Sequence, residues 1–579
     1  MDRRRRFRRA PLWAGAVLGA LAVARLASAL PQVANRHALG WDSARRALLD
    51  LGAADALRRA DLIGFVWRLV EPETWPTLRL ALAAPLHALA GPARAFGVEQ
   101  GLSIACFGAV AVGLALLARA VAPRGALAVL AVSAAALAGN GALVTHAANG
   151  MLEPLAAALT ATATAAWIGA RERRRARPWT LALLGNLLFH VKHQYGLFFA
   201  LAVTSVETLG DGALRPRAAA LAAALRDGVR GARGVALAAA TVLLGATAAA
   251  VSVTGGFDVA LAVRPITIRD AHGPLAFAAL AALVLVERAL WRGRARLATA
   301  FPERPRFLWA WLATPMAAWL VVPFTWRLRT LLGSAGFRTD DAPGGLGARL
   351  LYYPRGFYEG WIAPGVAPLA VALLAATVVA AWRAPALRRR LAPLAAVVGV
   401  ELLALALASR HNFQQRLALN LAPLVAVAAG AWVAALRPLP LRATLAGAAA
   451  LALAVAAAPR WRTGALADAM ARGFDPVERG ETCRRAAVAL AGGRAALVNG
   501  APISHVQGCT LWQAVVARER SGSVELVYHP GPRFDDAIVL SECSRPAPAL
   551  DGFAPSGAAF SEDPVCGQRY RRVPVVARP

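Results

Sequence analysis

The hydrophobic positions of this sequence gather into long runs that are separated by short, arginine-rich connectors. Many runs hold about 20 apolar residues, the length that crosses a lipid bilayer as a helix. Lipid offers no hydrogen-bond partner to an exposed backbone amide, so each crossing has to be helical. The pattern therefore predicts an all-α, polytopic membrane domain. The longest runs cover residues 12–30, 101–117, 126–144, 147–170, 235–253, 275–290, 308–322, 366–381, 391–408, 417–434 and 443–458.

The connectors predict how the chain is oriented. Segments such as "RRRRFRR", "RERRRAR" and "RAPALRRR" are expected to stay in the cytoplasm. They fall on one side only if residues 178–209 go out and back as a hairpin, which gives about 13 transmembrane helices. We therefore expect a multi-pass membrane protein, with its N-terminus in the cytoplasm and residues 31–100 on the outer side of the membrane.

Composition supports the membrane class. Hydrophobic residues make up 58% of the 579 residues and charged residues 17%, which is too apolar for a soluble globular protein. The formal net charge is +31. Because no basic motif is interleaved with aromatic residues, we attribute this charge to the cytoplasmic connectors and expect no nucleic-acid partner.

The pattern changes in the C-terminal tail. Acidic residues reappear there, and short strand-like runs such as "AALVNG", "VELVYH" and "DAIVL" alternate with helix-like segments. We expect residues 1–459 to form the membrane domain and residues 460–579 a small α/β domain in the periplasm, large enough for its own modest core.

Cysteine usage agrees with an exported tail. Four cysteines in such a domain suggest two disulfides with three possible pairings. A zinc site is the alternative, although none of the four has CxxC spacing. Cys106 lies in an apolar run and is expected to be an ordinary packing residue. The tail cysteines are Cys483, Cys509, Cys543 and Cys566.

The predicted hairpin holds Lys192, the only lysine in a chain with 64 lysines and arginines. About 14 residues separate it from Pro178, or about 21 Å of helix in a hydrocarbon core of about 30 Å, so it should lie near the outer headgroups. A lysine there can snorkel to phospholipid phosphates. Its polar neighbours, among them His193 and Tyr195, favour a functional site instead.

The first periplasmic loop is expected to carry surface helices. Residues 43–59 have the spacing of an amphipathic helix that lies in the membrane surface. Asp42 stands just before them, where a capping residue is expected; a cap alone is worth about 1 kcal/mol.

Four features in order resemble one family. Asp42 follows the first run, "WPTLRLALAAPLHALAG" covers residues 75–91, "NGMLEPL" covers 149–155, and "KHQYG" covers 192–196. This order resembles the GT-C integral-membrane glycosyltransferases, specifically the bacterial protein-mannosyltransferase and aminoarabinose-transferase-like branch. The resemblance covers about 200 residues. It is looser at "LLYYPRG" (350–356) and "HNFQQRLALNLAP" (411–423).

One departure from the family pattern stands out. Members commonly have two adjacent acids in the first loop, whereas Asp42 is followed here by Ser43. The role of the second acid then falls to another residue or to none. The candidates are Asp50, Asp55, Asp61 and Glu153.

The resemblance implies transfer of a sugar, with inversion, from a polyprenyl-phosphate carrier in the membrane. Such a donor carries its own leaving group, so the enzyme needs a base for the acceptor hydroxyl and cations for the departing phosphate. Asp42 is the candidate base and Lys192 the candidate phosphate ligand, with Arg416 as second choice. Arg416 is equally explained as an interfacial anchor. The acceptor is a glycan, a glycolipid or a protein.

Further substrate-binding candidates are Glu153, His193, Tyr195 and Tyr353. Glu153 has a structural alternative at a helix start, which favours acids, and Tyr353 has one in the aromatic headgroup belt. No metal-ligand set is evident, because His190 and His193 have no third partner nearby in sequence, so a divalent metal is not supported. The only cofactor-like group expected is the lipid-linked sugar.

Two other interpretations remain open. A transporter or flippase of lipid-linked saccharide would also have many spans, but such proteins are commonly built from repeated halves. We see no such repeat. A membrane scaffold that presents its outer domain is the third interpretation, and it gives Asp42, Glu153 and Lys192 no common cause.

Overall fold

The computed structural model describes most of the membrane domain and parts of the tail. The described residues are 2–34, 41–70, 77–172, 178–209, 214–254, 257–260, 265–268, 271–301, 303–321, 327–328, 345–361, 365–407, 414–473, 495–499, 525–527, 536–542, 549–550, 552–562 and 565–573.

The helices of the first half are α1 (Asp2–Ala29), α2 (Pro31–Ala34), α3 (Trp41–Arg58), α4 (Leu62–Val70), α5 (Thr77–Ala90), η1 (Pro92–Arg94), α6 (Ala95–Val121), α7 (Ala126–Ala138), α8 (Gly141–Thr145), α9 (Glu153–Glu172), α10 (Pro178–Val191), α11 (His193–Leu209), α12 (Leu214–Val229), α13 (Ala232–Thr254) and α14 (His272–Arg292). Those of the second half are α15 (Arg294–Ala300), α16 (Glu303–Leu308), η2 (Trp309–Ala313), α17 (Thr314–Val321), α19 (Leu346–Gly360), α20 (Val366–Arg383), α21 (Pro385–Leu407), η3 (Gln415–Leu421), α22 (Ala422–Gly430), η4 (Ala431–Ala435), α23 (Leu439–Ala457), η5 (Ala458–Trp461) and α24 (Thr463–Ala471).

The fold is that of a polytopic helical membrane protein, as the sequence predicts. Among the described residues, eight helical stretches are long and apolar enough to cross a bilayer. Three shorter apolar helices, Thr77–Ala90, Ala126–Ala138 and Pro178–Val191, add to them. The total of about 13 crossings stays a prediction.

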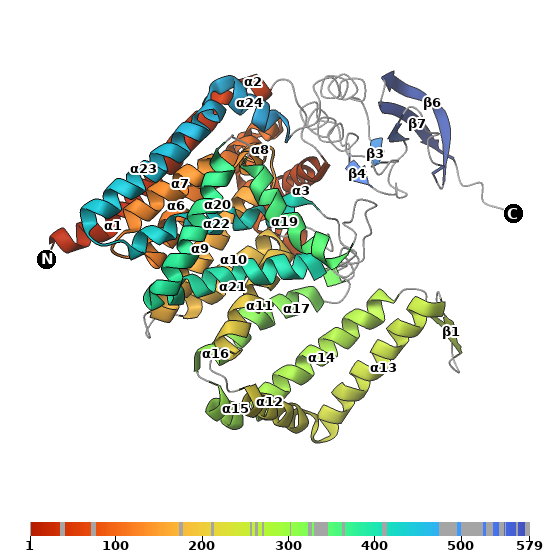
Figure 1. Ribbon diagram of the computed structural model, residues 1–579. Coiled ribbons are helices and arrows are strands. Elements are labelled where there is room, and N and C mark those ends of the chain that lie inside the picture. The colour runs from red at the N-terminus through yellow and green to blue at the C-terminus, as the bar shows by residue number, and fades with distance from the viewer. Residues whose placement is uncertain are drawn as a thin grey trace.

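The centre of the bundle is made by α6, α7, α9 and α22, and α1 and α23 pack along its outside (Figure 1). Small residues allow the close approach of α1 and α6: a Cβ added at Gly19 would lie 2.5 Å from the Gly108 oxygen. A buried core of alanine, leucine and valine fills the spaces between the helices. At one end of the bundle, α24 packs on α1, α2 and α8.

A second group of helices stands apart from this bundle (Figure 1). The two long helices α13 and α14 pack on each other. Helices α12 and α15 pack against α14 and against each other. The antiparallel strands β1 (Phe257–Ala260) and β2 (Pro265–Ile268) lie between α13 and α14 in sequence. α14 contacts α17, which links the pair to the rest of the membrane domain.

The predicted hairpin between residues 178 and 209 has its turn at Lys192. α10 ends at Val191 and α11 begins at His193, and the two helices pack on each other. The Lys192 carbonyl accepts hydrogen bonds from the backbone N–H groups of Tyr195 (3.0 Å) and Gly196 (3.4 Å). The turn is tight, because a Cβ at Gly196 would lie 2.3 Å from the Phe189 Cα.

The C-terminal tail contains a five-stranded sheet in the order β4-β3-β5-β7-β6. Its strands are β3 (Ala495–Asn499), β4 (Glu525–Val527), β5 (Asp536–Glu542), β6 (Phe553–Glu562) and β7 (Val565–Arg572). β3 pairs in parallel with β4 and β5, whereas β5, β7 and β6 are antiparallel. The strand-like runs predicted from the sequence correspond to β3, β4 and β5. The helix-like segments of the tail lie outside the described residues.

Strands β6 and β7 were not predicted. β6 holds Pro555 and Gly557, residues that usually count against a strand. The sheet accommodates them because β6 is an edge strand with register shifts between Pro555 and Gly557 and between Ala558 and Phe560. Cys566 on β7 is disulfide-bonded, and the other three tail cysteines lie outside the described residues. Cys106 is a free cysteine, as expected.

Gly19→Ala should destabilise the bundle by about 1–3 kcal/mol, the usual range for overpacking. The reason is that the new Cβ would meet a backbone oxygen at 2.5 Å and not a flexible side chain. Thermal unfolding in detergent measures this change. Gly101→Ala on α6 is the control, since a Cβ there meets nothing within 4 Å; equal melting of both variants would contradict the close approach of α1 and α6.

Candidate functional site

A network of buried charges joins α3 and α5 to the bundle. Arg79 on α5 donates to Asp50 of α3 at 2.8 Å and also to Glu99 of α6. His87 lies about two helical turns after Arg79 on the same face of α5. Its Nε2 lies 2.7 Å from the second Glu99 oxygen. All four residues are buried, with at most 3% of any of them exposed. We call Asp50, Arg79, His87 and Glu99 the Arg79 network.

Charge balance explains how this network tolerates burial. A lone buried charge is costly, but Arg79 faces two carboxylates at once. Burial, and next the Glu99 carboxylate, raise the pKa of Asp50 well above its usual range, and Arg79 opposes this shift. The network therefore fixes α3 and α5 on the end of α6.

The Arg79 network supports the turn that precedes α9. Gly150 has a φ of +77°, a conformation that favours glycine. A Cβ there would lie 3.3 Å from the Glu99 Oε2. The Gly150 N–H donates to Ser103 at 3.1 Å, and its carbonyl accepts from Arg46 of α3 at 3.3 Å. These contacts explain why the "NGM" segment is compact and buried.

Glu153 and Lys192, two residues singled out in the sequence, meet in the structure. Glu153 is the first residue of α9 and 1% exposed, and its Oε1 lies 3.9 Å from the Lys192 Nζ. The Nζ also lies 5.0 Å from the centroid of the Tyr195 ring, which is fully buried. The Lys192 side chain keeps 21% of its surface exposed. A cation at the hairpin turn is thus held beside a buried carboxylate and stays accessible.

Two arginines complete the positive surroundings of Glu153. Arg46 and Arg416 both point a guanidinium nitrogen at the Met151 sulfur, at 3.5 and 3.8 Å. Both act electrostatically on Glu153, as do Lys192 and His146. Three cationic side chains from α3, the hairpin turn and η3 therefore converge on one carboxylate. Such a surplus of positive charge suits an anionic substrate group.

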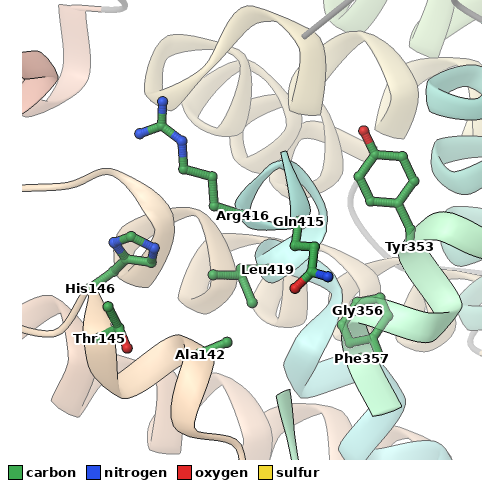
Figure 2. A pocket seen from close by; sticks show the side chains of 9 residues that line it. All are labelled: Ala142, Thr145, His146, Tyr353, Gly356, Phe357, Gln415, Arg416 and Leu419. Atoms are coloured by element: carbon green, nitrogen blue, oxygen red, sulfur yellow. The ribbon is translucent and has the colours of Figure 1, made fainter. Parts of the chain in front are cut away.

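A cavity of about 180 Å³ adjoins this group (Figure 2). Arg416 and His146 lie on one side of it, and Tyr353 of α19 lies on the other. Burial lowers the pKa of His146, although the Glu153 carboxylate opposes that shift, and burial raises the pKa of the Tyr353 hydroxyl. The remaining lining residues are Ala142, Thr145, Gly356, Phe357, Gln415 and Leu419. The cavity therefore offers uncharged hydrogen-bonding groups beside a guanidinium.

Asp42 lies in the first turn of α3, which begins at Trp41 and so starts two residues earlier than predicted. Its side chain is outside what the structure describes. Position 42 precedes Arg46 by one helical turn, so the two positions share a face of α3. Of the motifs from the sequence, Trp75, Pro76 and residues 411–413 also lie outside the described residues.

The structure separates the other candidates into two groups. Tyr195 and Arg416 join Glu153 and Lys192, and Tyr353 lines the adjoining cavity. His193 packs elsewhere, with its ring 4.7 Å from that of Phe189. Arg46, His146 and Met151 were missed by sequence reasoning. Arg46 carried a usable signal, because it stands four residues after Asp42.

The structure also brings together a set of potential metal ligands that the sequence did not indicate. Ligand atoms of Asp50, His87 and Glu99 lie within 4.8 Å of one another. Arg79 already bridges the two carboxylates. The guanidinium supplies the positive charge at this position, so the set acts as an ion-pair network.

Comparison with known proteins gives structural likenesses only. No protein-family model matches the chain, and no curated protein matches it significantly. The crystal structure of ArnT from Cupriavidus metallidurans bound to undecaprenyl phosphate has 13% identity and a TM-score of 0.47, covering 97% of this chain and 98% of that chain. ArnT in the apo state has 11% identity and a TM-score of 0.45, with 96% and 97% covered.

An archaeal protein is similar over part of its length. The oligosaccharyltransferase AglB from Archaeoglobus fulgidus, in complex with an inhibitory peptide and a dolichol-phosphate, has 14% identity and a TM-score of 0.44 over 88% of this chain. The chain spans 63% of AglB. Likenesses at this level support no functional conclusion by themselves.

Arg79→Met should destabilise the protein by about 3–5 kcal/mol, because it leaves two buried carboxylates without their cation. Chemical or thermal unfolding in detergent measures the loss. The control is Arg230→Met, which removes an ion pair with Asp227 whose arginine side chain is 72% exposed; exposed pairs contribute little. A loss no larger than that of the control would show that the Arg79 network does not hold α3 and α5 in place.

Proposed function

We propose that the protein is a glycosyltransferase. It moves a sugar from a polyprenyl-phosphate donor to a glycan, glycolipid or protein acceptor at the periplasmic face of a bacterial inner membrane. The observation that carries the proposal is the meeting of Lys192 and Glu153, 3.9 Å apart, beside Arg46 and Arg416. This arrangement offers cations for a lipid phosphate where the predicted topology puts the end of the bilayer.

The reaction needs a cation for the departing phosphate and a base for the acceptor hydroxyl. The acceptor hydroxyl attacks the anomeric carbon as the bond from that carbon to the phosphate oxygen breaks, and the phosphate leaves with the electron pair. Lys192 stabilises the negative charge that grows on the departing phosphate, with Arg416 as the second cation. Asp42 takes the proton of the acceptor hydroxyl as general base. A single displacement of this kind inverts the anomeric centre.

Three further features support this assignment. Position 42 lies one turn before Arg46, and Arg46 and Arg416 share the Met151 sulfur, so α3 borders the same group of cations. The cavity beside Arg416 contains groups that hydrogen-bond sugar hydroxyls, among them Tyr353. A long-chain phosphate donor would reach Lys192 from the lipid, at the headgroup level predicted for the hairpin turn. The Lys192 side chain is 21% exposed and can therefore contact it.

Glu153 has a positioning role in this proposal. Its carboxylate holds the Lys192 ammonium at the turn, which keeps a flexible side chain ready for the phosphate. Its Oε2 has no hydrogen-bond partner among the described residues and is buried. That oxygen is free to accept from a hydroxyl of the sugar or of the acceptor.

Asp42→Asn should lower transfer about 10²- to 10⁴-fold, the usual worth of a general base, and should leave the fold intact. Turnover of a labelled polyprenyl-phosphate sugar by the purified protein measures this loss, and thermal unfolding checks the fold. Asp468→Asn on the exposed side of α24 is the control. Transfer at the wild-type rate by Asp42→Asn would remove the base assignment.

Lys192→Ala should raise the donor KM about tenfold or more, because a hydrogen bond to a charged group is worth about 1.5–3 kcal/mol. Steady-state kinetics with varied donor concentration separate this effect from a change in kcat. The variant also leaves Glu153 buried beside an empty position, so a second variant is needed.

Lys192→Ala combined with Glu153→Gln resolves the ambiguity. If loss of the ammonium itself weakens donor binding, the double variant stays defective. If the defect of Lys192→Ala came only from an unpaired Glu153 carboxylate, the double variant would recover donor binding, and the phosphate role of Lys192 would be wrong.

A further inference from the structure

A second polar cluster lies at the hairpin turn and is not used by the chemistry above. His190 and His193 come from the turn, Trp319 from α17, and Arg327 from the short described segment 327–328. The Arg327 guanidinium lies 3.9 Å from the centroid of the Trp319 ring. The His190 ring meets the Trp319 ring edge-on at 4.9 Å. We call these four residues the donor cluster, where donor means a hydrogen-bond donor and not the sugar donor.

Arg327 is the charged member and is 2% exposed. Its guanidinium has five N–H donors, and two nitrogens donate to backbone carbonyls, Nη2 to Val70 at 2.5 Å and Nη1 to Trp319 at 3.3 Å. Burial lowers its pKa to about 10, so it remains a cation at neutral pH. Within the described part of the chain, no carboxylate lies at ion-pair distance from it.

The neighbours of Arg327 add donors and few acceptors. The Trp319 Nε1–H can only donate, and it is buried with no hydrogen-bond partner among the described residues. The Nε2 of His193, a side chain that is 8% exposed, and the Nε2 of Gln194 in the same turn are also buried without a partner among the described residues. The Gln194 amide nitrogen can only donate, whereas the His193 Nε2 donates in one of the two neutral tautomers. Buried polar groups are normally paired. The unpaired N–H groups of Trp319 and Gln194 therefore indicate a missing acceptor, which the His193 Nε2 contacts as a donor in the matching tautomer.

Electrostatics connects these groups. Arg327 acts on both His190 and His193, so the two imidazoles and the guanidinium lie within electrostatic reach of one another. His190 is held by Thr77 of α5, whose hydroxyl lies 3.1 Å from the Nδ1. With that nitrogen engaged, the opposite nitrogen of His190 is available to the cluster. A ligand at this position meets positive charge and N–H groups, which disfavours a cation.

A purely structural role explains only part of the cluster. The two carbonyl bonds of Arg327 tie the end of α4 to the end of α17, and the stacked Trp319 covers the guanidinium. This role gives no acceptor to the Trp319 Nε1–H or to His193. An oxyanion with several acceptor lone pairs satisfies these donors together.

We propose that the donor cluster is a second anion site, separate from Lys192, that binds a phosphate-type oxyanion through Arg327, the Trp319 Nε1–H and His193. The oxyanion is either the phosphate of an anionic lipid headgroup or free phosphate. The site is defined by anion binding alone, so it stands or falls independently of the proposed sugar transfer.

The test uses the full-length protein in neutral detergent, with the thermal midpoint as readout. Inorganic phosphate is titrated in one arm and dihexanoyl phosphatidic acid in the other, with dihexanoyl phosphatidylcholine as the matched zwitterion. We expect a concentration-dependent stabilisation in at least one arm. A response to phosphatidic acid alone identifies the headgroup as the source, and a response to phosphate alone identifies the free anion. No response in either arm would overturn the proposal.

Trp319→Phe is the decisive variant, because it removes one N–H and keeps an aromatic ring beneath Arg327. The anion concentration that gives half of the thermal shift should rise about tenfold. The thermal midpoint without anion should stay unchanged, whereas a purely structural role of Trp319 would lower it. Trp291→Phe is the matched control, since Trp291 also stacks on an arginine, at 4.5 Å from Arg294, but is 70% exposed. Equal anion responses of the two variants would overturn the proposal.

Two more variants keep the test independent of folding and of the first site. Arg327→Gln should abolish the shift and Arg327→Lys should retain part of it, and an unchanged shift in Arg327→Gln would count against the site. In Lys192→Ala, the part of the anion-dependent thermal shift that Trp319→Phe weakens should remain. If that component disappears, the anion binds at Lys192 and the donor cluster is not a separate site.

Discussion

The position of α3 and α5 on the bundle depends on one buried guanidinium. Arg79 holds Asp50 and Glu99 at the same time, and these residues lie on three different helices. In a protein interior such a bond is directional and costly to break. Apolar packing is not directional, so it specifies the register of α3 on α5 less sharply than a buried ion pair does. The ion pairs fix one register, and with it the place of Arg46 and of position 42.

The same network reaches the candidate site through a glycine. Gly150 packs against Glu99 on one side and accepts from Arg46 on the other. The turn that it forms leads to Met151, whose sulfur is contacted by both Arg46 and Arg416. Glu153 follows at the start of α9. The chain of contacts from Arg79 to Glu153 is continuous. The contacts that fix α3 and α5 are therefore linked to the carboxylate beside Lys192.

The sequence predicted the helical class, the hairpin turn at Lys192 and three strands of the tail, because each follows from local periodicity or from charge. It also placed Glu153 and Lys192 among the site candidates. It did not predict the Arg79 network. Arg79 and Asp50 are 29 residues apart and look like the ordinary polar face of surface helices, so only the packing of α3 on α5 reveals their pairing. Strand β6 was missed for the opposite reason, since an edge strand tolerates the proline and glycine that local rules exclude.

The break between α10 and α11 lets one turn serve two clusters. Lys192 lies outside both helices, and its carbonyl accepts from the first N–H groups of α11. Consecutive residues on a regular helix do not face each other, and the break separates their directions further. Lys192 turns to Glu153 and Tyr195, whereas His190 meets Trp319 and Arg327 acts on His193. At the first position Lys192 has a compact ammonium on a flexible stem, beside Glu153. At the second, the planar Arg327 guanidinium stacks on Trp319, which holds it in one orientation.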